Sequence, residues 1–527
     1  MIELTGKHLI AGEENGSGSD TFTSVNPRTR QPGDLGFGEA TAAAIDAAVK
    51  AAATAFRETR RYSAEHLAGF LDQVADEIEA LGNQLLDVTD QETGLGLPRL
   101  TGERGRTTGQ LRRFGELLRE GSYVEAIIDS AQPQRQPTPR PAIKRMLVPI
   151  GPVAVFSASN FPFAFAVAGG DTASAFAAGC PVVVKGHPSH PRTSELFARA
   201  IIKAVKRSGF PPGYFSLLQG KGTAVGQQLV THPGIAAVGF TGSLRGGRAI
   251  YDAAAARPEP IPVYAEMGSV NPMVLLPGAV NGQADELAAN LVGSLILGSG
   301  QFCTNPGLIL LIDSVESQNF IQRVAARMAD AQAGVLLNAQ IEEGVDQAVS
   351  KTLEKSAVTF LTGGKRVPGE AFCYANTVMQ TTSAAFRADP DLQEEHFGPV
   401  TLFVVAESAE DLLQTVDALH GNLTASVHAA SDELELVKAL FDRLQPNVGR
   451  LIFNGFPTGV EVVHAMQHGG PYPATTAPWT TSVGMTAIKR FMRPVAFQDL
   501  PEELLPPALQ DANPLGIWRI VNDEYTR

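Results

Sequence analysis

The sequence predicts an α/β protein with two large domains and a smaller appended element. Three observations lead to this prediction. The chain has 527 residues, more than one hydrophobic core usually organises. Short β-branched runs alternate with helix-length, alanine-rich segments. The alternation stops and then restarts after residue 272, as expected when one parallel sheet with flanking helices is followed by another.

The first parallel sheet is expected between residues 152 and 265. Its strands are predicted by apolar runs at residues 152–157, 181–185, 214–218, 235–240 and 261–265. Parallel sheets bind ligands beyond the carboxyl ends of their strands, where backbone amides and helix N-termini converge. Functional residues are therefore sought directly after each of these runs.

Helices and a boundary precede this sheet, and a second α/β domain follows it. Apolar residues at helical spacing predict helices at residues 42–56 and 64–81, and the Pro- and Gln-rich stretch 133–141 marks a boundary. A further helix is predicted at residues 283–297, with alternation continuing to about residue 480. The tail after residue 501 carries no motif and is expected to wrap the surface.

Composition excludes several classes of protein. The chain has 42 basic and 55 acidic residues, a net charge of -13 and no basic patch, so nucleic acid is not expected as a partner. The three cysteines, Cys180, Cys303 and Cys373, form no Cys-x-x-Cys pair, so neither a disulfide framework nor a metal site is expected. Free thiols favour a reducing compartment, and we expect a cytoplasmic protein.

Two nearly uncharged segments, residues 152–184 and 287–312, are long enough to span a membrane. Polar residues and prolines interrupt both, which is typical of buried α/β core. The first 12 residues contain Glu3 and lack the basic start and long apolar run of a signal peptide. No membrane association is expected.

Cys303 is the candidate nucleophile. A lone cysteine in an apolar stretch is most often a small core residue. Cys303 differs because Gly298, Gly300 and Gly307 predict a tight turn around it, which lets a substrate approach the sulfur. The other two cysteines lack such neighbours.

Glu266 and Asn160 follow predicted strands at the expected binding edge. Glu266 is either a solvated loop carboxylate or a general base. At the mouth of a dry cleft its pKa should rise towards neutrality. Asn160 is either a turn residue or a side-chain amide that donates to an oxyanion.

Glycine-rich turns suggest where a dinucleotide binds. The segment 220–226 has one residue too many for the usual fingerprint. The segment Thr241-Gly242-Ser243, followed by Gly247, is a better pyrophosphate site because it joins a strand to a helix and leaves backbone amides free for the ligand.

Five ordered motifs resemble those of the aldehyde dehydrogenase superfamily, and the resemblance extends from near the N-terminus to about residue 500. The motifs are residues 159–162 (SNFP), 240–243 (FTGS), 266–272 (EMGSVNP), 300–303 (GQFC) and 394–400 (EEHFGPV). The family usually has Trp at Ser159, Leu at Met267, Gly at Ser269 and an apolar residue at His396. The chain therefore resembles a divergent branch.

The resemblance implies an aldehyde dehydrogenase-like fold. A Rossmann-type dinucleotide-binding domain is expected at residues 1–138 and 157–271, and a second α/β catalytic domain at residues 272–480. A small β oligomerisation element is expected at residues 139–156 and 486–505. A homodimer or homotetramer is the implied assembly.

The resemblance also implies oxidation of an aldehyde to a carboxylic acid. Cys303 would attack the aldehyde to form a thiohemiacetal and then a thioester, with Glu266 as general base. Asn160 and the Cys303 backbone amide would form the oxyanion hole. The residues expected to line the substrate pocket are Phe161, Phe165 and Phe456.

The cofactor implied by the resemblance is a nicotinamide dinucleotide. Lys185 and Glu395 would contact its riboses, and Phe397 would flank the nicotinamide. Many members carry a Lys-Pro-Ser-Glu run where this chain reads KGHP, so the acidic group that would repel a 2′-phosphate is missing. We expect NADP to be accepted, with NAD as the alternative, and His187 and Lys221 to contact the phosphate.

The substrate is suggested by two C-terminal segments, residues 449–460 (GRLIFNGFPTGV) and 468–473 (HGGPYP). They resemble the branch of the family that acts on 2-oxoglutarate semialdehyde (2,5-dioxopentanoate). The alternative is a branch that oxidises long-chain aldehydes. Ala168 replaces a bulky aromatic residue of many members, which suggests a reshaped pocket. The sequence does not identify a cation for the substrate carboxylate.

Two alternatives come from other classes of protein. A cofactor-free thiol hydrolase would pair Cys303 with His464 or His468, but it leaves the five motifs unexplained. A nucleotide-binding structural protein without catalysis is disfavoured because Cys303, Glu266 and Asn160 are all present.

Overall fold

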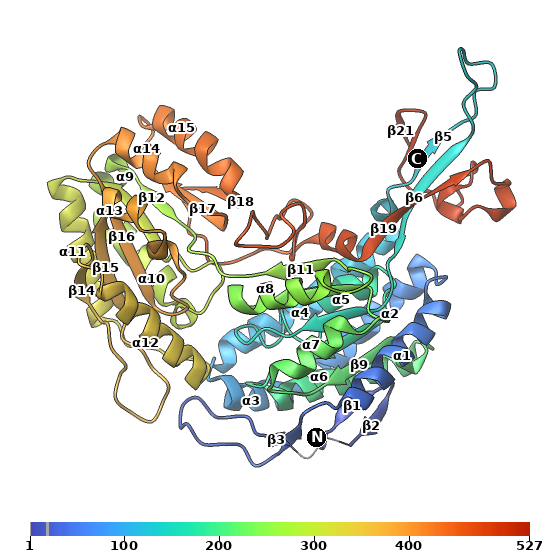
Figure 1. Ribbon diagram of the computed structural model, residues 1–527, viewed down its shortest axis with the longest axis horizontal. Helices are drawn as coiled ribbons and strands as arrows, with labels where there is room; N and C mark the ends of the chain where they lie inside the picture. Colours follow the sequence, from blue (N-terminus) through green and yellow to red (C-terminus); the bar gives the residue numbers. More distant parts are fainter. Residues whose placement is uncertain (1, 17–19) are drawn as a thin grey trace.

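The computed structural model, which describes residues 2–16 and 20–527, contains two α/β bodies and an arm that projects from the first (Figure 1). The first body is drawn mainly in blue to green and the second in yellow to orange. The arm, at the upper right, carries the C-terminus. This architecture confirms the predicted fold class.

The first body is built on a sheet in which the central strands are parallel. From edge to edge the order is β11 (Val263–Glu266), β10 (Ala237–Thr241), β7 (Val153–Phe156), β8 (Val182–Lys185), β9 (Phe215–Leu218), β1 (His8–Ile10) and β2 (Glu13–Asn15). Strands β11 to β9 run parallel, whereas β1 and β2 are antiparallel additions. The five predicted strands are therefore confirmed.

Helices cover both faces of this sheet because alternate strand residues point to opposite sides. One core joins Val153, Val155 and Val182 to α2 (Ala64–Glu79), α3 (Gly82–Thr93), α4 (Leu97–Glu120), α5 (Gly170–Ala177) and α6 (Pro191–Arg207). The other joins Ala154 and Phe156 to α1 (Ala42–Thr59), α7 (Thr223–Thr231) and α8 (Leu244–Ala255). Apolar residues from both faces thus sandwich the sheet.

The second body repeats the same plan. Its sheet has the order β14 (Thr359–Thr362), β15 (Thr377–Thr382), β16 (Val400–Ala406), β13 (Leu308–Ile312), β12 (Met273–Leu275), β17 (Asn422–His428) and β18 (Val448–Phe453). All neighbouring pairs except β14 with β15 are parallel. This is the second α/β domain that the sequence predicts.

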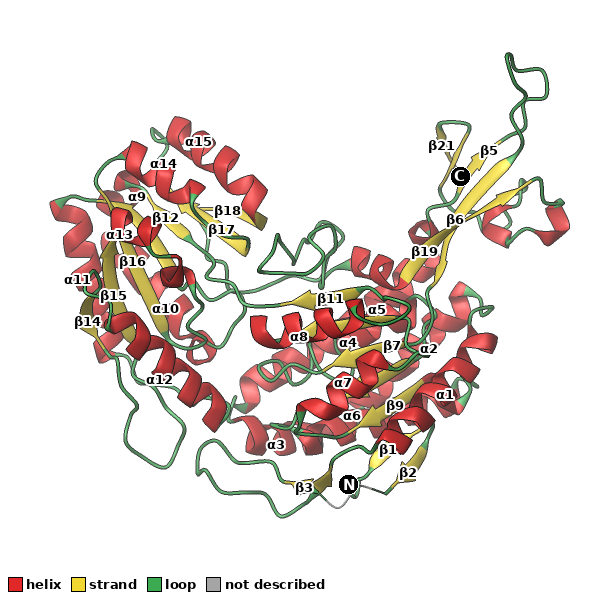
Figure 2. Ribbon diagram, in the orientation of Figure 1, coloured by secondary structure: helices red, strands yellow, loops and turns green. Residues whose placement is uncertain are grey.

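Helices again lie on both faces of the second sheet (Figure 2). One face packs on α9 (Pro277–Gly282), α10 (Ala284–Ile296) and α11 (Val315–Asp330). The other packs on α12 (Ala339–Leu353), α13 (Ser383–Ala388), α14 (Ala409–Asp417) and α15 (Leu434–Leu444).

The arm is a mixed sheet that joins distant parts of the sequence. Its order is β19 (Met492–Gln498), β6 (Ile143–Pro149), β5 (Ile127–Asp129), β20 (Arg519–Val521) and β21 (Glu524–Thr526). The tail after residue 501 therefore does more than wrap the surface, because β20 pairs with the otherwise open edge of β5. Strand β7, expected in the oligomerisation element, pairs instead with β8 and β10 in the first sheet.

The two uncharged segments of the sequence are buried in the sheets and their covering helices. Val153, Val182 and Val184 of the first segment are fully buried, as are Leu291 and Leu310 of the second. Across residues 2–16 and 20–527, no helix combines the length and apolar character needed to cross a membrane.

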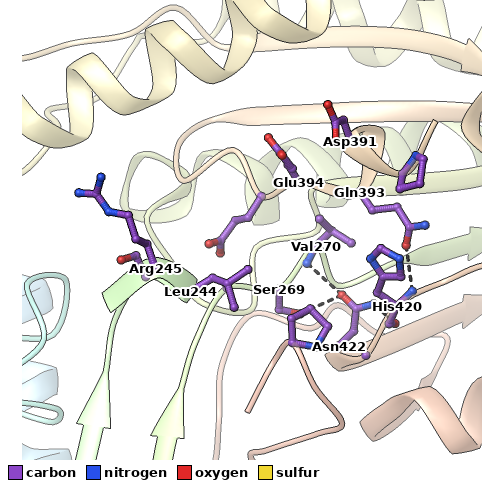
Figure 3. A pocket seen from close by; sticks show the side chains of 15 residues that line it. Leu244, Arg245, Ser269, Val270, Asp391, Gln393, Glu394, His420 and Asn422 are labelled. Carbon is purple, nitrogen blue, oxygen red and sulfur yellow. Dashed lines mark hydrogen bonds between the residues drawn. The ribbon is translucent and has the colours of Figure 1, made fainter. Parts of the chain in front are cut away.

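Asn422 fixes the junction between the two bodies, where residues 267–272 connect β11 to β12. Its side-chain oxygen accepts hydrogen bonds from the Val270 and Asn271 amides and from the Ser269 hydroxyl, at 3.0, 3.2 and 3.1 Å. Figure 3 shows the hydrogen bonds from Val270 and Ser269 to Asn422 on the wall of a cavity of about 490 Å³. Arg245 of the first body and Asp391 of the second also line this cavity.

Replacing Asn422 with Ala should destabilise the junction. The substitution leaves the buried Val270 and Asn271 amides without their acceptor, so we expect a loss of roughly 2–4 kcal/mol in the free energy of unfolding. Thermal unfolding should show the Tm lowered by several degrees. Asn83→Ala, at an exposed position of α3, is the control, and its Tm should stay within about 1 °C of the wild-type value. Equal Tm values for the two variants would contradict the role given to Asn422.

Candidate active site

The strand order of the first sheet reverses between β7 and β10. The chain proceeds from β7 to β8 and β9 on one side, and then returns to β10 and β11 on the other. Loops that leave two neighbouring strands in opposite directions open a crevice at their carboxyl ends. Asn160 follows β7 and Ser243 follows β10, so both residues lie at this crevice.

The second body contributes Cys303 on the turn between α10 and β13. The backbone reaches this turn through Gly298, Ser299 and Gly300, all with positive φ. Gly300 is required because a Cβ there would lie 2.1 Å from the Gly398 carbonyl oxygen. The tight turn that the glycine spacing predicts is therefore present.

Asn160, Glu266 and Cys303 line one cavity of about 350 Å³. The same cavity is lined by Thr241, Gly242, Ser243, Glu395 and Phe397. The structure thus brings together the three candidate catalytic residues and most of the candidate cofactor residues. They come from both bodies, so the junction between the bodies shapes this cavity.

His468 lies between the candidate nucleophile and the candidate base. Its Nε2 is 3.0 Å from Glu266 Oε1 and 3.5 Å from Cys303 Sγ. The Ser482 hydroxyl donates to the other oxygen of Glu266. The hydrolase alternative anticipated the contact between Cys303 and His468, whereas the other histidine that it named, His464, is exposed.

The Cys303 thiol is protonated in the resting enzyme at neutral pH. Burial raises its pKa well above the ordinary value, and the neighbouring Glu266 carboxylate raises the pKa further through its charge and a hydrogen bond. The Arg106 guanidinium acts in the opposite direction but is outweighed. Formation of the reactive thiolate therefore needs a proton acceptor close to the sulfur.

Glu266 differs from the expectation of a pKa near neutrality. Burial acts to raise the pKa of its carboxyl, but the charge of His468 and hydrogen bonds from His468, Ser482 and Cys303 outweigh that effect. The pKa therefore lies below its ordinary value. The sequence argument considered desolvation alone and missed these partners. An ionised Glu266 is ready to accept a proton from the thiol or from water.

Asn160 is held in place from both sides. Its side-chain Nδ2 donates to the Gln301 backbone carbonyl at 3.0 Å. The backbone carbonyl of Asn160 accepts from Arg99 Nη2 at 2.6 Å. A primary amide has two N–H groups, so one remains for an oxygen bound next to Cys303. This geometry suits an oxyanion donor.

The turn into α8 fits a dinucleotide pyrophosphate. A Cβ at Gly242 would lie 2.7 Å from the Phe240 ring, and one at Gly247 would lie 2.6 Å from Met267. The helix start is consequently packed close to the sheet. Ser243 caps the Gly246 amide, and the preceding turn is exposed to the cavity, as an anion-binding helix N-terminus requires.

Two ionisable groups suit ribose hydroxyls. Burial raises the pKa of Glu395 to about 7, and its carboxylate lies against Gly268. Burial lowers the pKa of Lys185, at the end of β8, to about 8, while the Glu39 carboxylate acts in the opposite direction. Both side chains can change charge near neutral pH.

The two residues expected to contact a 2′-phosphate, Lys221 and His187, differ in exposure and in charge. Lys221 is exposed and lines a further cavity of about 160 Å³ with Pro188 and Ser189. His187 stacks on His190 with ring centroids 5.3 Å apart. Burial and the nearby positive groups lower its pKa well below the ordinary value, so its ring is neutral and offers little to a phosphate.

Glu39 is a site residue that the sequence analysis missed. Its Oε1 accepts hydrogen bonds from the Lys221 and Gly222 amides at 2.6 and 2.8 Å, at the start of α7. A carboxylate therefore occupies the amides that could have held a phosphate. Glu39 is distant in sequence from every motif, so no local signal pointed to it.

Phe161 and Phe165 flank the site, with ring centroids 5.4 Å apart, and Phe165 lies 6.2 Å from the His468 ring. Phe456 packs instead on His428 and on the core beneath α10 and α11. Its expected role in the substrate pocket stays a prediction.

The chain belongs to the aldehyde dehydrogenase family, because residues 14–472 match that family. It is thus an NAD(P)-dependent aldehyde dehydrogenase family enzyme. It is similar to alpha-ketoglutaric semialdehyde dehydrogenase 2 of Azospirillum brasilense, with 47% identity over 98% of this chain and 99% of the relative. It is also 43% identical to the alpha-ketoglutaric semialdehyde dehydrogenase of Acinetobacter baylyi over the full length of both chains.

Solved structures show the same fold. Betaine aldehyde dehydrogenase of Staphylococcus aureus aligns with a TM-score of 0.80 and 21% identity, over 94% of this chain and 95% of that one. A 3,6-anhydro-L-galactose dehydrogenase in complex with NAP aligns with a TM-score of 0.79 and 21% identity, over 93% and 99% of the two chains. These structures support the architecture described above.

Alkylation should reveal the electrostatic coupling between Cys303 and Glu266. Because the thiol pKa is raised, the rate of Cys303 modification by iodoacetamide should keep increasing with pH up to at least about 9. Glu266→Gln removes a negative charge that raises this pKa, so modification at pH 8 should become roughly three- to tenfold faster.

The extent of modification at each cysteine can be followed by peptide mass spectrometry. Cys373 in the same digest is the internal control and should react equally in both proteins. A slower reaction of Cys303 in Glu266→Gln would contradict the assigned coupling.

Proposed function

We propose that this enzyme oxidises 2-oxoglutarate semialdehyde to 2-oxoglutarate. The observation that carries the proposal is the similarity, at 47% and 43% identity over essentially the whole chain, to two enzymes named for this substrate. The cavity that joins Asn160, Glu266 and Cys303 supports the reaction. The proposal agrees with the two C-terminal segments that resemble the same branch.

The first half of the reaction uses Cys303 as nucleophile. Glu266, directly or through His468, accepts the thiol proton while the sulfur bonds to the aldehyde carbon. The free N–H of Asn160 donates to the oxygen, whose negative charge increases as the carbon becomes tetrahedral. A bound nicotinamide dinucleotide would supply the hydride acceptor. Loss of hydride leaves the acyl group on Cys303 as a thioester.

The second half hydrolyses the thioester. Glu266 takes a proton from a water molecule as its oxygen attacks the acyl carbon. Sulfur leaves as the thiolate, which regains a proton, and the carboxylic acid is released. Glu266 must release the thiol proton to solvent between the two halves, because only the ionised carboxylate can take a proton from water.

Steady-state kinetics with a panel of aldehydes tests the substrate assignment. We expect kcat/KM for 2-oxoglutarate semialdehyde to exceed the values for pentanal and dodecanal by about 100-fold or more, since a carboxylate recognised by the site contributes several kcal/mol. Cys303→Ala provides the background rate. Highest efficiency with dodecanal would support the long-chain alternative and contradict the proposal.

We further propose that NADP is accepted alongside NAD, and that Glu39 limits its use. Lys221 and Lys185 would offer positive charge near the adenosine ribose. Glu39, from the segment before α1, places a carboxylate against the loop that carries Lys221. A 2′-phosphate would approach that carboxylate at close range, and like charges repel. Binding of NADP should therefore improve when Glu39 is neutralised.

Glu39→Gln should shift cofactor choice. The amide keeps an acceptor for the Lys221 amide but removes the charge, so the ratio of kcat/KM with NADP to that with NAD should rise about tenfold. Exposed Glu13→Gln on β2 is the control and should leave the ratio unchanged. An unchanged ratio in Glu39→Gln would refute the role of this carboxylate.

We also propose a cytoplasmic homodimer or homotetramer. The arm supports assembly, because β19 lies at an edge of its sheet and offers backbone groups to a second chain. The free cysteines are consistent with a reducing compartment.

A further inference from the structure

Arg106 lies on α4, and its cationic side chain faces the active site. The guanidinium carbon is 5.5 Å from the Phe165 ring centroid and 5.9 Å from that of Phe161. Phe165 in turn lies beside His468, which contacts Cys303. Arg106 therefore borders the side of the nucleophile that is lined by aromatic rings.

The Arg106 side chain lacks the partners that a buried guanidinium normally has. Its Nε and Nη2 are buried, and neither has a hydrogen-bond partner in the described part of the chain. Burying a charge without a partner is costly, and buried polar groups are almost always hydrogen-bonded. An arginine with unused donors next to a reactive thiol thus indicates an anion that arrives with the substrate.

Two other arginines near the site, Arg99 and Arg450, already donate hydrogen bonds to the backbone. Arg99 stacks on Phe161 and Phe302 and donates to the Asn160 carbonyl, so it positions the oxyanion donor. Arg450 on β18 donates to the carbonyls of Pro457 and Gly459. One donor each of Arg99 and Arg450 also lacks a partner, but other donors of both side chains bind backbone carbonyls, whereas Arg106 has two buried donors without a partner in the described part of the chain.

The Glu103 carboxylate is held through one of its oxygens, while the other, Oε2, has no hydrogen-bond partner in the described residues. One of its oxygens accepts from the Phe163 and Ala164 amides at 2.9 and 3.0 Å, which ties α4 to the loop after β7. Glu103 lies one turn before Arg106 on the same helix, and it balances charge without forming a hydrogen-bonded pair with it. The Nε and Nη2 donors of Arg106 stay available for a planar carboxylate, which a guanidinium can bind through two parallel hydrogen bonds.

We propose that Arg106 binds the carboxylate of a short aldehyde acid and places its aldehyde at Cys303. This inference rests on the proposed function, and it names the residue that recognises the anion. The flanking rings of Phe161 and Phe165 would contact the methylene groups between the two ends. The enzyme should accordingly select anionic aldehydes of short chain over neutral ones.

The test compares Arg106→Gln with wild-type enzyme on 2-oxoglutarate semialdehyde and on pentanal, a neutral aldehyde of similar length. Loss of a charged partner at a desolvated site should reduce kcat/KM for the anion roughly 30-fold or more, mainly through KM. The value for pentanal should change less than about threefold. Arg113→Gln, on the solvent side of the same helix, is the control and should match wild type.

Arg106→Lys adds a second measurement that does not depend on the glutamine variant folding. Lysine keeps the positive charge but cannot donate two parallel hydrogen bonds to a carboxylate. The KM for the anion should therefore lie between those of wild type and Arg106→Gln. Binding of 2-oxoglutarate, measured by calorimetry, should weaken in the same order. Rates for pentanal report folding and the state of Cys303 in each variant.

The outcomes separate the inference from the proposed function. An equal loss of kcat/KM with both aldehydes would show that Arg106 acts on the Cys303 thiol and not on the substrate carboxylate. That result would overturn the inference. An unchanged KM for the anion, in a wild-type enzyme that prefers the anion, would also overturn it while leaving the proposed function intact. A wild-type enzyme that shows no preference for the anionic aldehyde would refute the proposed function itself.

Discussion

The active site depends on how the connector between the two bodies is held. Glu266 ends the last strand of the first sheet, and Cys303 belongs to the second body. The side chain of Asn422 accepts hydrogen bonds from the backbone of the connector. The side chain of Asn271, which belongs to the connector, donates to the Cys303 carbonyl at 2.8 Å. These hydrogen bonds hold the segments that carry the proposed base and the proposed nucleophile next to each other. Buried amides without these partners would cost several kcal/mol, so the junction is tightly specified.

Electrostatic balance at this junction determines reactivity. Burial by itself would leave both Cys303 and Glu266 neutral. The contact with His468 allows the Glu266 carboxylate to stay ionised beside a protonated thiol, so a proton acceptor lies next to the proposed nucleophile. The unpaired guanidinium of Arg106 adds a positive charge to the same region. In the proposed mechanism, separate groups would hold the proton, the oxyanion and the substrate carboxylate.

Local patterns predicted the sheets well and helix α4 not at all. The strands of the first sheet were found because β-branched runs have a clear period and length. Residues 101–110 of α4 contain no hydrophobic side chain and three glycines, so the usual helical pattern is absent there. That stretch buries polar groups such as Glu103 and Thr107, which find partners only in the folded chain.

The sequence by itself determined the fold class and the family resemblance, and it named Cys303, Glu266 and Asn160 as candidates, because strand periodicity and strand-end motifs are local. Only the tertiary structure placed Glu39 and Arg106 at the site, because both come from segments far from those motifs. It also showed that His468, which the hydrolase alternative paired with Cys303, contacts Glu266. It also reversed the expected direction of the Glu266 pKa. The physical reason is that desolvation, charge pairing and the loss of hydrogen-bond partners are properties of a packed neighbourhood.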